Sequence, residues 1–212
     1  MTDRLVKGFR EFKKAYYSDS NSLMPKLVQE GQHPEYFIIS CIDSRSNPGH
    51  VFNAQPGAFL GHRSMGAIVR PYRLGNALAA ALQFAIKHMD IKKIIVLGHT
   101  QCGAINALCK HLDDVEISSF IEIAQQALDK AESYSKTDED VSQNTEKEAV
   151  LLGVENLKTY PSVQEALDNG DIIIKAWLFD MLNGELLEYD YNQNEFVVSI
   201  YYEKTLCQKE AM

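Results

Sequence analysis

Residues 93–104, KIIVLGHTQCGA, join a continuous apolar run to a polar turn. The run over 93–99 is typical of a strand buried in a parallel sheet, where helices cover both faces. A helical pattern begins directly after it, at Gln101. A strand followed at once by a helix is the repeating unit of α/β folds, so this stretch predicts a parallel sheet flanked by helices.

The rest of the chain repeats this alternation of strands and helices. These elements predict one α/β domain over residues 1–212, with a mostly parallel central sheet, an N-terminal helical arm and a C-terminal edge strand or hairpin. The polar stretch 135–148 is expected to be a solvated turn. The predicted strands are 36–40, 57–63, 93–99 and 171–180, with 184–190 and 195–201 as the terminal pair, and the predicted helices are 74–89, 117–134, 147–160 and 162–170.

Length and charge narrow the class of protein. A chain of 212 residues can bury a sizeable core. Its net charge of −8 argues against nucleic-acid binding, which requires a basic face. We find no apolar run near twenty residues and no secretory pattern at the N-terminus, so we expect a cytoplasmic protein that does not enter a membrane. Leu5, Phe9 and Phe12 lie along one side of the N-terminal segment, which predicts an amphipathic helix.

Reactive side chains follow two of the predicted strands. Cys41, Asp43 and Arg45 alternate after the first strand, and on an extended segment they would point the same way. His99 and Cys102 follow the strand 93–99. Ligands bind beyond the carboxyl ends of parallel strands, so we expect the two clusters to meet there although they lie far apart in sequence.

Together the clusters offer two thiolates and one imidazole. Cys₂His with a fourth position left open is a ligand set of catalytic zinc, and Zn²⁺ suits soft sulfur and nitrogen donors. The spacing alone leaves an alternative open, because a buried cysteine is often only a packing residue. Cys109 is interpreted in that way, and Cys207 is interpreted as an incidental residue of the C-terminal tail.

The motifs CIDSR (41–45) and GHTQCGA (98–104) together resemble those of the β-class carbonic anhydrase family, whose signature is C-x-D-S-R followed by H-x-x-C-G. The stretches GQHPEYFIISC (31–41) and HVFNAQPG (50–57) are most similar to the plant-type branch. The resemblance implies that Cys41, His99 and Cys102 bind zinc, and that zinc-bound hydroxide reversibly hydrates CO₂ to bicarbonate and a proton. It also implies a homodimer or homotetramer, with the arm 1–31 packing on the partner subunit.

The resemblance also suggests roles for residues around the metal. Arg45 would grip Asp43 with its planar fork, so that the carboxylate stays off the zinc and accepts a hydrogen bond from the hydroxide. Left free, Asp43 could become a fourth ligand in a closed state. The competing interpretation of this pair is a structural cap on the strand end. Gln32 would reach a substrate oxygen, in the neighbouring subunit's site, and Gly103 would let the following helix approach the metal, with backbone N–H groups that steady the thiolates or an anion.

The sequence departs from the family pattern beside the expected pocket. His62 stands where an aliphatic residue is expected, and Ser64 and Ala67 stand where asparagine is common. These changes bear on substrate preference more than on zinc binding. They keep one alternative open, a zinc hydrolase of a CO₂ analogue such as carbonyl sulfide or carbon disulfide. A second alternative is a closed structural zinc module without activity. The ligands of that module would be Cys41, Asp43, His99 and Cys102.

Overall fold

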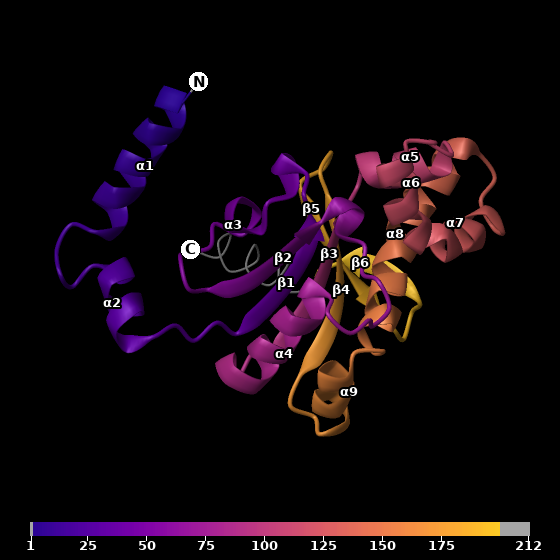
Figure 1. Ribbon diagram of the computed structural model, residues 1–212. Coiled ribbons are helices and arrows are strands. Elements are labelled where there is room, and N and C mark those ends of the chain that lie inside the picture. The colour runs from indigo at the N-terminus through magenta and orange to yellow at the C-terminus, as the bar shows by residue number, and fades with distance from the viewer. Residues whose placement is uncertain (1, 200–212) are drawn as a thin grey trace, which may run out of the picture.

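The computed structural model describes residues 2–199, and within them a mostly parallel sheet forms the centre of the molecule (Figure 1). The strand order is β2-β1-β3-β4-β5-β6, in which the first four strands are parallel and β5 and β6 form an antiparallel hairpin. The predicted α/β class and the terminal hairpin are confirmed, while residues 200–201 and Cys207 lie outside the described residues. The strands are β1 (Tyr36–Cys41), β2 (Phe59–Ser64), β3 (Lys93–His99), β4 (Ile173–Asp180), β5 (Glu185–Asp190) and β6 (Glu195–Val198).

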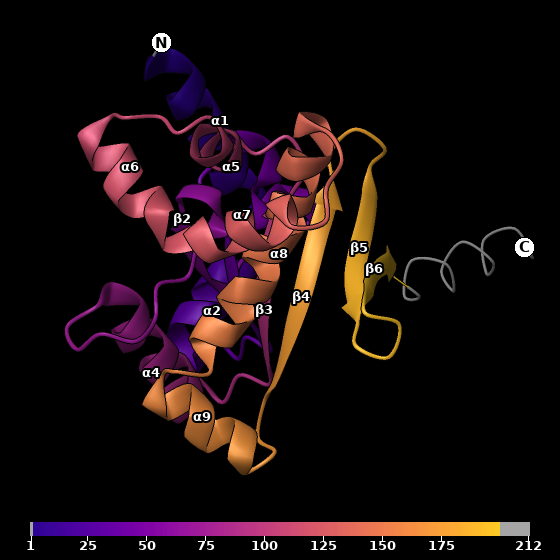
Figure 2. The ribbon, with the colours of Figure 1, turned by 90° about the vertical axis from the view of Figure 1, so that its right-hand side faces the viewer.

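Helices surround this sheet, and Figure 2 shows α5, α6 and α7 gathered at one end with α4 and α9 at the other. The α-helices are α1 (Thr2–Tyr16), α2 (Leu23–Glu30), α3 (Pro48–Val51), α4 (Ala77–Met89), α5 (Gly103–Cys109), α6 (Val115–Ile121), α7 (Gln125–Glu132), α8 (Asp138–Leu157) and α9 (Pro161–Asp168). Within residues 2–199 there are also three short 3₁₀ turns: η1 (Ser44–Ser46), η2 (Met65–Ala67) and η3 (Glu122–Ala124).

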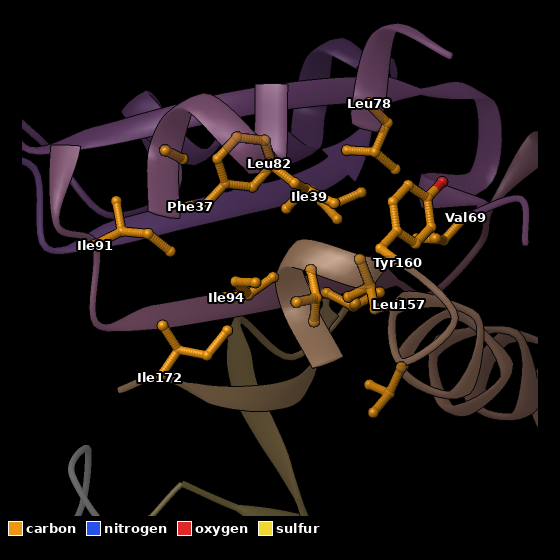
Figure 3. Close-up of a cluster of buried hydrophobic side chains, with 14 of the residues drawn as sticks. Phe37, Ile39, Val69, Leu78, Leu82, Ile91, Ile94, Leu157, Tyr160 and Ile172 are labelled. Carbon is orange, nitrogen blue, oxygen red and sulfur yellow. The ribbon is translucent and has the colours of Figure 1, made fainter. Parts of the chain in front are cut away.

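The main core lies between one face of the sheet and helices α4, α8 and α9 (Figure 3). Alternate residues of β1 and β3, such as Ile39 and Ile94, meet Leu82 and Leu157 from the helices. The buried hydroxyl of Tyr160 donates a hydrogen bond to the carbonyl oxygen of Arg70 at 2.8 Å, so this polar atom is satisfied inside the core. The packing fixes β1 and β3 side by side, and with them the two strand ends that carry the reactive residues.

Truncation of this core has a large expected cost. Leu157 is fully buried, and Leu157→Ala should lower the free energy of unfolding by about 2–5 kcal/mol because it removes apolar contacts and leaves a cavity. Urea unfolding of both forms measures the change. Leu74→Ala is the matched control, since Leu74 is exposed. Equal losses in the two variants would contradict this description of the core.

Two predictions about the helices are wrong. The stretch 135–148 is not a turn, because α8 begins at Asp138, where the side chain of Thr137 accepts a hydrogen bond from the N–H of Asp140 and acidic residues occupy the first turn. Acidic side chains in the first turn stabilise a helix through their favourable interaction with the helix dipole. The single helix predicted over 117–134 is interrupted, because α6 ends at Ile121 and the 3₁₀ turn η3 precedes α7.

The arm consists of α1 and α2, and α1 stands away from the sheet (Figure 1). Leu5 and Phe9 on α1 are 78% and 61% exposed. The arm touches the body where Leu27 of α2 packs against Gly57. The predicted helical arm is confirmed in its conformation. Within residues 2–199, every helix is too short or too polar to cross a membrane.

Candidate metal centre

Three potential metal ligands meet at the carboxyl ends of β1 and β3. Cys41 is the last residue of β1, His99 is the last residue of β3, and Cys102 immediately precedes α5. One ligand atom from each lies within 4.8 Å of the others. All three are buried, at 4%, 2% and 3% exposure. The prediction that the two sequence clusters meet at this edge is therefore confirmed.

Backbone N–H groups surround both sulfur atoms. Those of Asp43 and Gly66 donate to Cys41 Sγ at 3.4 and 3.3 Å, and those of Ala104 and Ile105 favour the thiolate of Cys102. The Cys102 thiol donates to the neighbouring sulfur, and this lowers the pKa of Cys41 to about 4 although burial opposes the shift. The same contact raises the pKa of Cys102. The pair thus shares a proton that a divalent cation would displace.

The imidazole of His99 is oriented for a metal as well. Its Nδ1 lies 2.9 Å from the carbonyl oxygen of Thr100, an acceptor that places the ring proton on Nδ1. In the neutral imidazole Nε2 is then unprotonated, and among the described residues this buried atom has no hydrogen-bond partner. An unpaired buried nitrogen and two sulfur atoms together form a donor set that zinc prefers. The residues present therefore fit the ion.

Asp43 and Arg45 lie beside this group, but they do not alternate along an extended strand as predicted. The chain leaves β1 after Cys41 and enters η1, which Asp43 caps by accepting the N–H of Arg45 at 2.8 Å. This turn brings the guanidinium back over the carboxylate. Arg45 Nε donates to Asp43 Oδ1 at 3.1 Å, and Nη2 donates to Oδ2 at 2.8 Å. The bidentate contact holds the pKa of Asp43 well below its usual range, so this carboxylate is ionised.

Arg63 of β2 supports the same segment, and our sequence analysis assigned it no role. Its guanidinium donates to the carbonyl oxygen of Cys41 at 2.9 and 2.8 Å and to that of Asp43 at 2.7 Å. These bonds fix the backbone that carries the first ligand and the carboxylate. Nothing in the spacing of Arg63 indicates such a contact, which depends on the pairing of β1 with β2.

Glu146 of α8 is a second residue that sequence analysis missed. Its buried Oε1 accepts the N–H of Cys102 at 2.8 Å. It was overlooked because 135–148 was interpreted as a solvated turn. Thr137 and Asp140 form a helix-start pattern of the kind T-x-x-D, and this pattern could have extended the helix back to Asp138 and placed Glu146 within it.

Burial raises the pKa of Glu146 from 4.5 to about 7, so the folded protein holds this proton more tightly than the unfolded chain does. The resulting stabilisation is complete below pH 4.5 and is lost as the pH rises through about 7. When the pH is raised from 4.5 to about 7, the free energy of unfolding of the metal-free protein should fall by about 3 kcal/mol through the ionisation of Glu146. Glu146→Gln, which keeps the acceptor, should lack that component. Urea unfolding at several pH values tests this, and identical pH dependence in both forms would contradict it.

The predicted substrate residues lie differently with respect to the three ligands. Gly103 starts α5 next to Cys102, but a Cβ at this position would meet no described atom within 4 Å, so this chain itself gives no steric reason for glycine. Gln32 is exposed and precedes β1, at the opposite end of that strand from Cys41. The chain therefore does not bring Gln32 to its own metal group. Cys109 lies in α5, outside the ligand group.

Comparison with known proteins places this chain in a family. The sequence profile of the carbonic anhydrase family matches residues 36–186. A carbonic anhydrase from Synechocystis is 31% identical over 203 residues, which cover 92% of this chain and 73% of the relative. The chain therefore belongs to the carbonic anhydrase family.

Solved structures define the class within that family. The β-carbonic anhydrase CcaA is 29% identical and superposes with a TM-score of 0.84, covering 93% of this chain and 99% of the other. A structure from work on two tetrameric β-carbonic anhydrases of Sordaria macrospora is 23% identical, with a TM-score of 0.70 and coverage of 88% and 92%, and shows likeness of fold. The protein is an enzyme of the β class, with a Cys-His-Cys group that can hold a metal ion. The closer likeness to the plant-type branch stays a prediction.

Proposed function

We propose that Cys41, His99 and Cys102 bind Zn²⁺ and that the protein reversibly converts CO₂ and water to bicarbonate and a proton. The observation that carries this proposal is the meeting of three buried ligand atoms within 4.8 Å, beside an ionised carboxylate in a bidentate grip. When bound, zinc would act as a Lewis acid that makes a water molecule nucleophilic near neutral pH.

The carboxylate of Asp43 would accept the O–H of the attacking water and direct an oxygen lone pair toward the carbon of CO₂. Arg45 limits the movement of Asp43, because the N–H, Nε and Nη2 groups of Arg45 engage both carboxylate oxygens. This grip favours an open state over the closed state in which Asp43 would be a fourth ligand. The guanidinium also lies 3.5 Å from the carbonyl oxygen of Gln101, which ties the carboxylate to the loop that carries Cys102.

Substrate contacts follow from the same geometry. We assign Gly103 to the site because it begins the helix next to Cys102, where its N–H can face an anionic product. Gln32 can contribute only to the site of another subunit, since it lies at the far end of β1. Leu5 and Phe9 are exposed on the apolar face of α1. This exposure supports a homodimer or homotetramer in which the arm 1–31 of one subunit packs on a neighbouring subunit. We place the protein in the cytoplasm, where the two thiols stay reduced.

A comparison of substrates separates this function from its closest alternative, a zinc hydrolase of carbonyl sulfide or carbon disulfide. Zinc-loaded protein is offered CO₂ and, separately, each sulfur analogue, and kcat/KM is measured for each. A higher kcat/KM for CO₂ supports the proposal, and turnover of the sulfur compounds alone overturns it. X-ray absorption at the zinc edge and solvent exchange test the structural alternative. Two sulfur ligands, one imidazole and one exchangeable water indicate an open site, whereas two sulfur ligands, the imidazole and the carboxylate of Asp43 at alkaline pH, with no exchangeable water and no turnover, indicate a closed one.

A further inference from the structure

Thr100, which follows the proposed zinc ligand His99, is tied to the end of β4 by three hydrogen bonds. Its backbone N–H donates to the carbonyl oxygen of Phe179 at 3.0 Å. Its hydroxyl accepts the N–H of Met181 at 3.0 Å and donates to Asp180 Oδ1 at 3.4 Å. These bonds fix the backbone N–H and the side chain of Thr100 against the end of β4, although the residue lies just beyond the last residue of β3.

Asp180 is itself held in place by the turn between β4 and β5. Its Oδ1 accepts the N–H groups of Leu182 at 2.9 Å and Asn183 at 3.2 Å, and its Oδ2 accepts the side-chain amide of Asn183 at 2.8 Å. Burial tends to raise the pKa of Asp180, but the hydrogen bonds from Asn183, Leu182 and Thr100 together lower it. The carboxylate is therefore a fixed acceptor that orients the hydroxyl of Thr100.

The carbonyl group of Thr100 is the part of this network that reaches the metal group. It accepts a hydrogen bond from His99 Nδ1 at 2.9 Å. Nε2 is thereby left available as the metal-ligand atom beside Cys41 and Cys102. A ligating histidine depends on such an outer partner for its tautomer and ring orientation. A displacement of Thr100 from the end of β4 would move this acceptor away from the ring.

We propose that Thr100 and Asp180 form a positioning unit that fixes the tautomer and orientation of His99, and thereby sets the affinity and geometry of the metal site from the β4–β5 turn. Neither side chain belongs to the ligand group, so both are positioning residues. The inference rests on the proposed role of His99 as a zinc ligand.

The first test removes the hydroxyl while keeping the shape of the side chain. Thr100→Val should weaken zinc binding about 10–100-fold, measured by competition with a chromogenic chelator. In the Co²⁺-substituted protein, the visible absorption bands should shift because the imidazole is less firmly oriented. Thr100→Ser keeps the hydroxyl and should restore both the affinity and the spectrum. Unchanged affinity and spectrum in Thr100→Val would overturn the proposal.

The second test compares two equivalent turns. Asp180→Ala removes the fixed acceptor and should also weaken zinc binding. Asp190→Ala is the matched control, because Asp190 holds the β5–β6 turn at the other end of β5 through the N–H of Asn192 at 2.7 Å and the amide of Gln193 at 2.9 Å. Zinc affinity should stay near the wild-type value in Asp190→Ala. An equal loss in both variants would mean general destabilisation and would overturn the proposal.

These outcomes are separate from failure of the proposed function. Wild-type protein that binds zinc tightly but does not hydrate CO₂ would refute the enzymatic proposal, and the effects of Thr100→Val and Asp180→Ala on zinc affinity would still decide the positioning role. Wild-type protein that binds no zinc would refute both.

Discussion

Cys102→Ala is expected to abolish zinc binding after dialysis and to reduce kcat/KM for CO₂ hydration by more than about a hundredfold, beyond the usual effect of changing an outer partner of a metal ligand. The variant leaves one thiolate and one imidazole, too few ligands to hold the ion in a defined geometry. Metal analysis and stopped-flow hydration assays on the same samples measure the two effects together.

Cys109→Ala provides the matched control. Cys109 belongs to α5, the helix that follows Cys102, and lies outside the group of three ligand atoms. Its replacement should leave zinc content and turnover close to those of the wild type. Loss of zinc in Cys109→Ala, or full activity in Cys102→Ala, would show that the ligand set has been assigned wrongly.

Arg45→Gln is expected to lower kcat/KM about 10–100-fold while zinc stays bound. The substitution removes the guanidinium that engages both oxygens of Asp43. The carboxylate would then be free to turn toward the metal position and act as a fourth ligand. Arg45→Lys keeps the charge without the bidentate geometry, so its kcat/KM should lie between those of the wild type and Arg45→Gln. Hydration rates of the three forms, normalised to zinc content, test this order.

Lys92→Gln is the control for the loss of an ion pair in itself. Lys92 contacts Asp90 at 2.7 Å, with the same spacing in sequence as Arg45 and Asp43, but the side chain of Asp90 is 85% exposed whereas that of Asp43 is 19% exposed. Surface pairs of this kind contribute little, so activity should not change. If Arg45→Gln keeps the wild-type rate, Asp43 and Arg45 are only a structural cap on the strand end.

The sheet and the ligand set could be predicted because their signals are local. A continuous apolar run such as 93–99 fits a strand buried on both faces, and strand ends in a parallel sheet meet on one side. Cys41 and His99 each close such a run, so their meeting follows from topology alone. The motifs around them carried the resemblance that the comparisons with known proteins support.

The supporting residues could not be predicted because their contacts join segments that are distant in sequence. Glu146 reaches Cys102 only because α8 begins earlier than expected. The first turns of α8 are polar, so the sequence there resembles a loop although the later turns of the helix are buried. Arg63 reaches Cys41 through strand pairing, and the bonds between Thr100 and Asp180 link the ends of β3 and β4. The turn η1 was missed because Asp43 caps it with its own side chain, a local contact that overrides the extended pattern.

The measurement that tests the central claim most directly is stopped-flow CO₂ hydration by zinc-loaded and metal-free samples of one preparation, from pH 6.5 to 9. We predict a catalysed rate that is proportional to zinc content, rises with pH and disappears when the metal is removed. Hydration at the uncatalysed rate across this range, with one zinc ion bound per chain, would contradict the account.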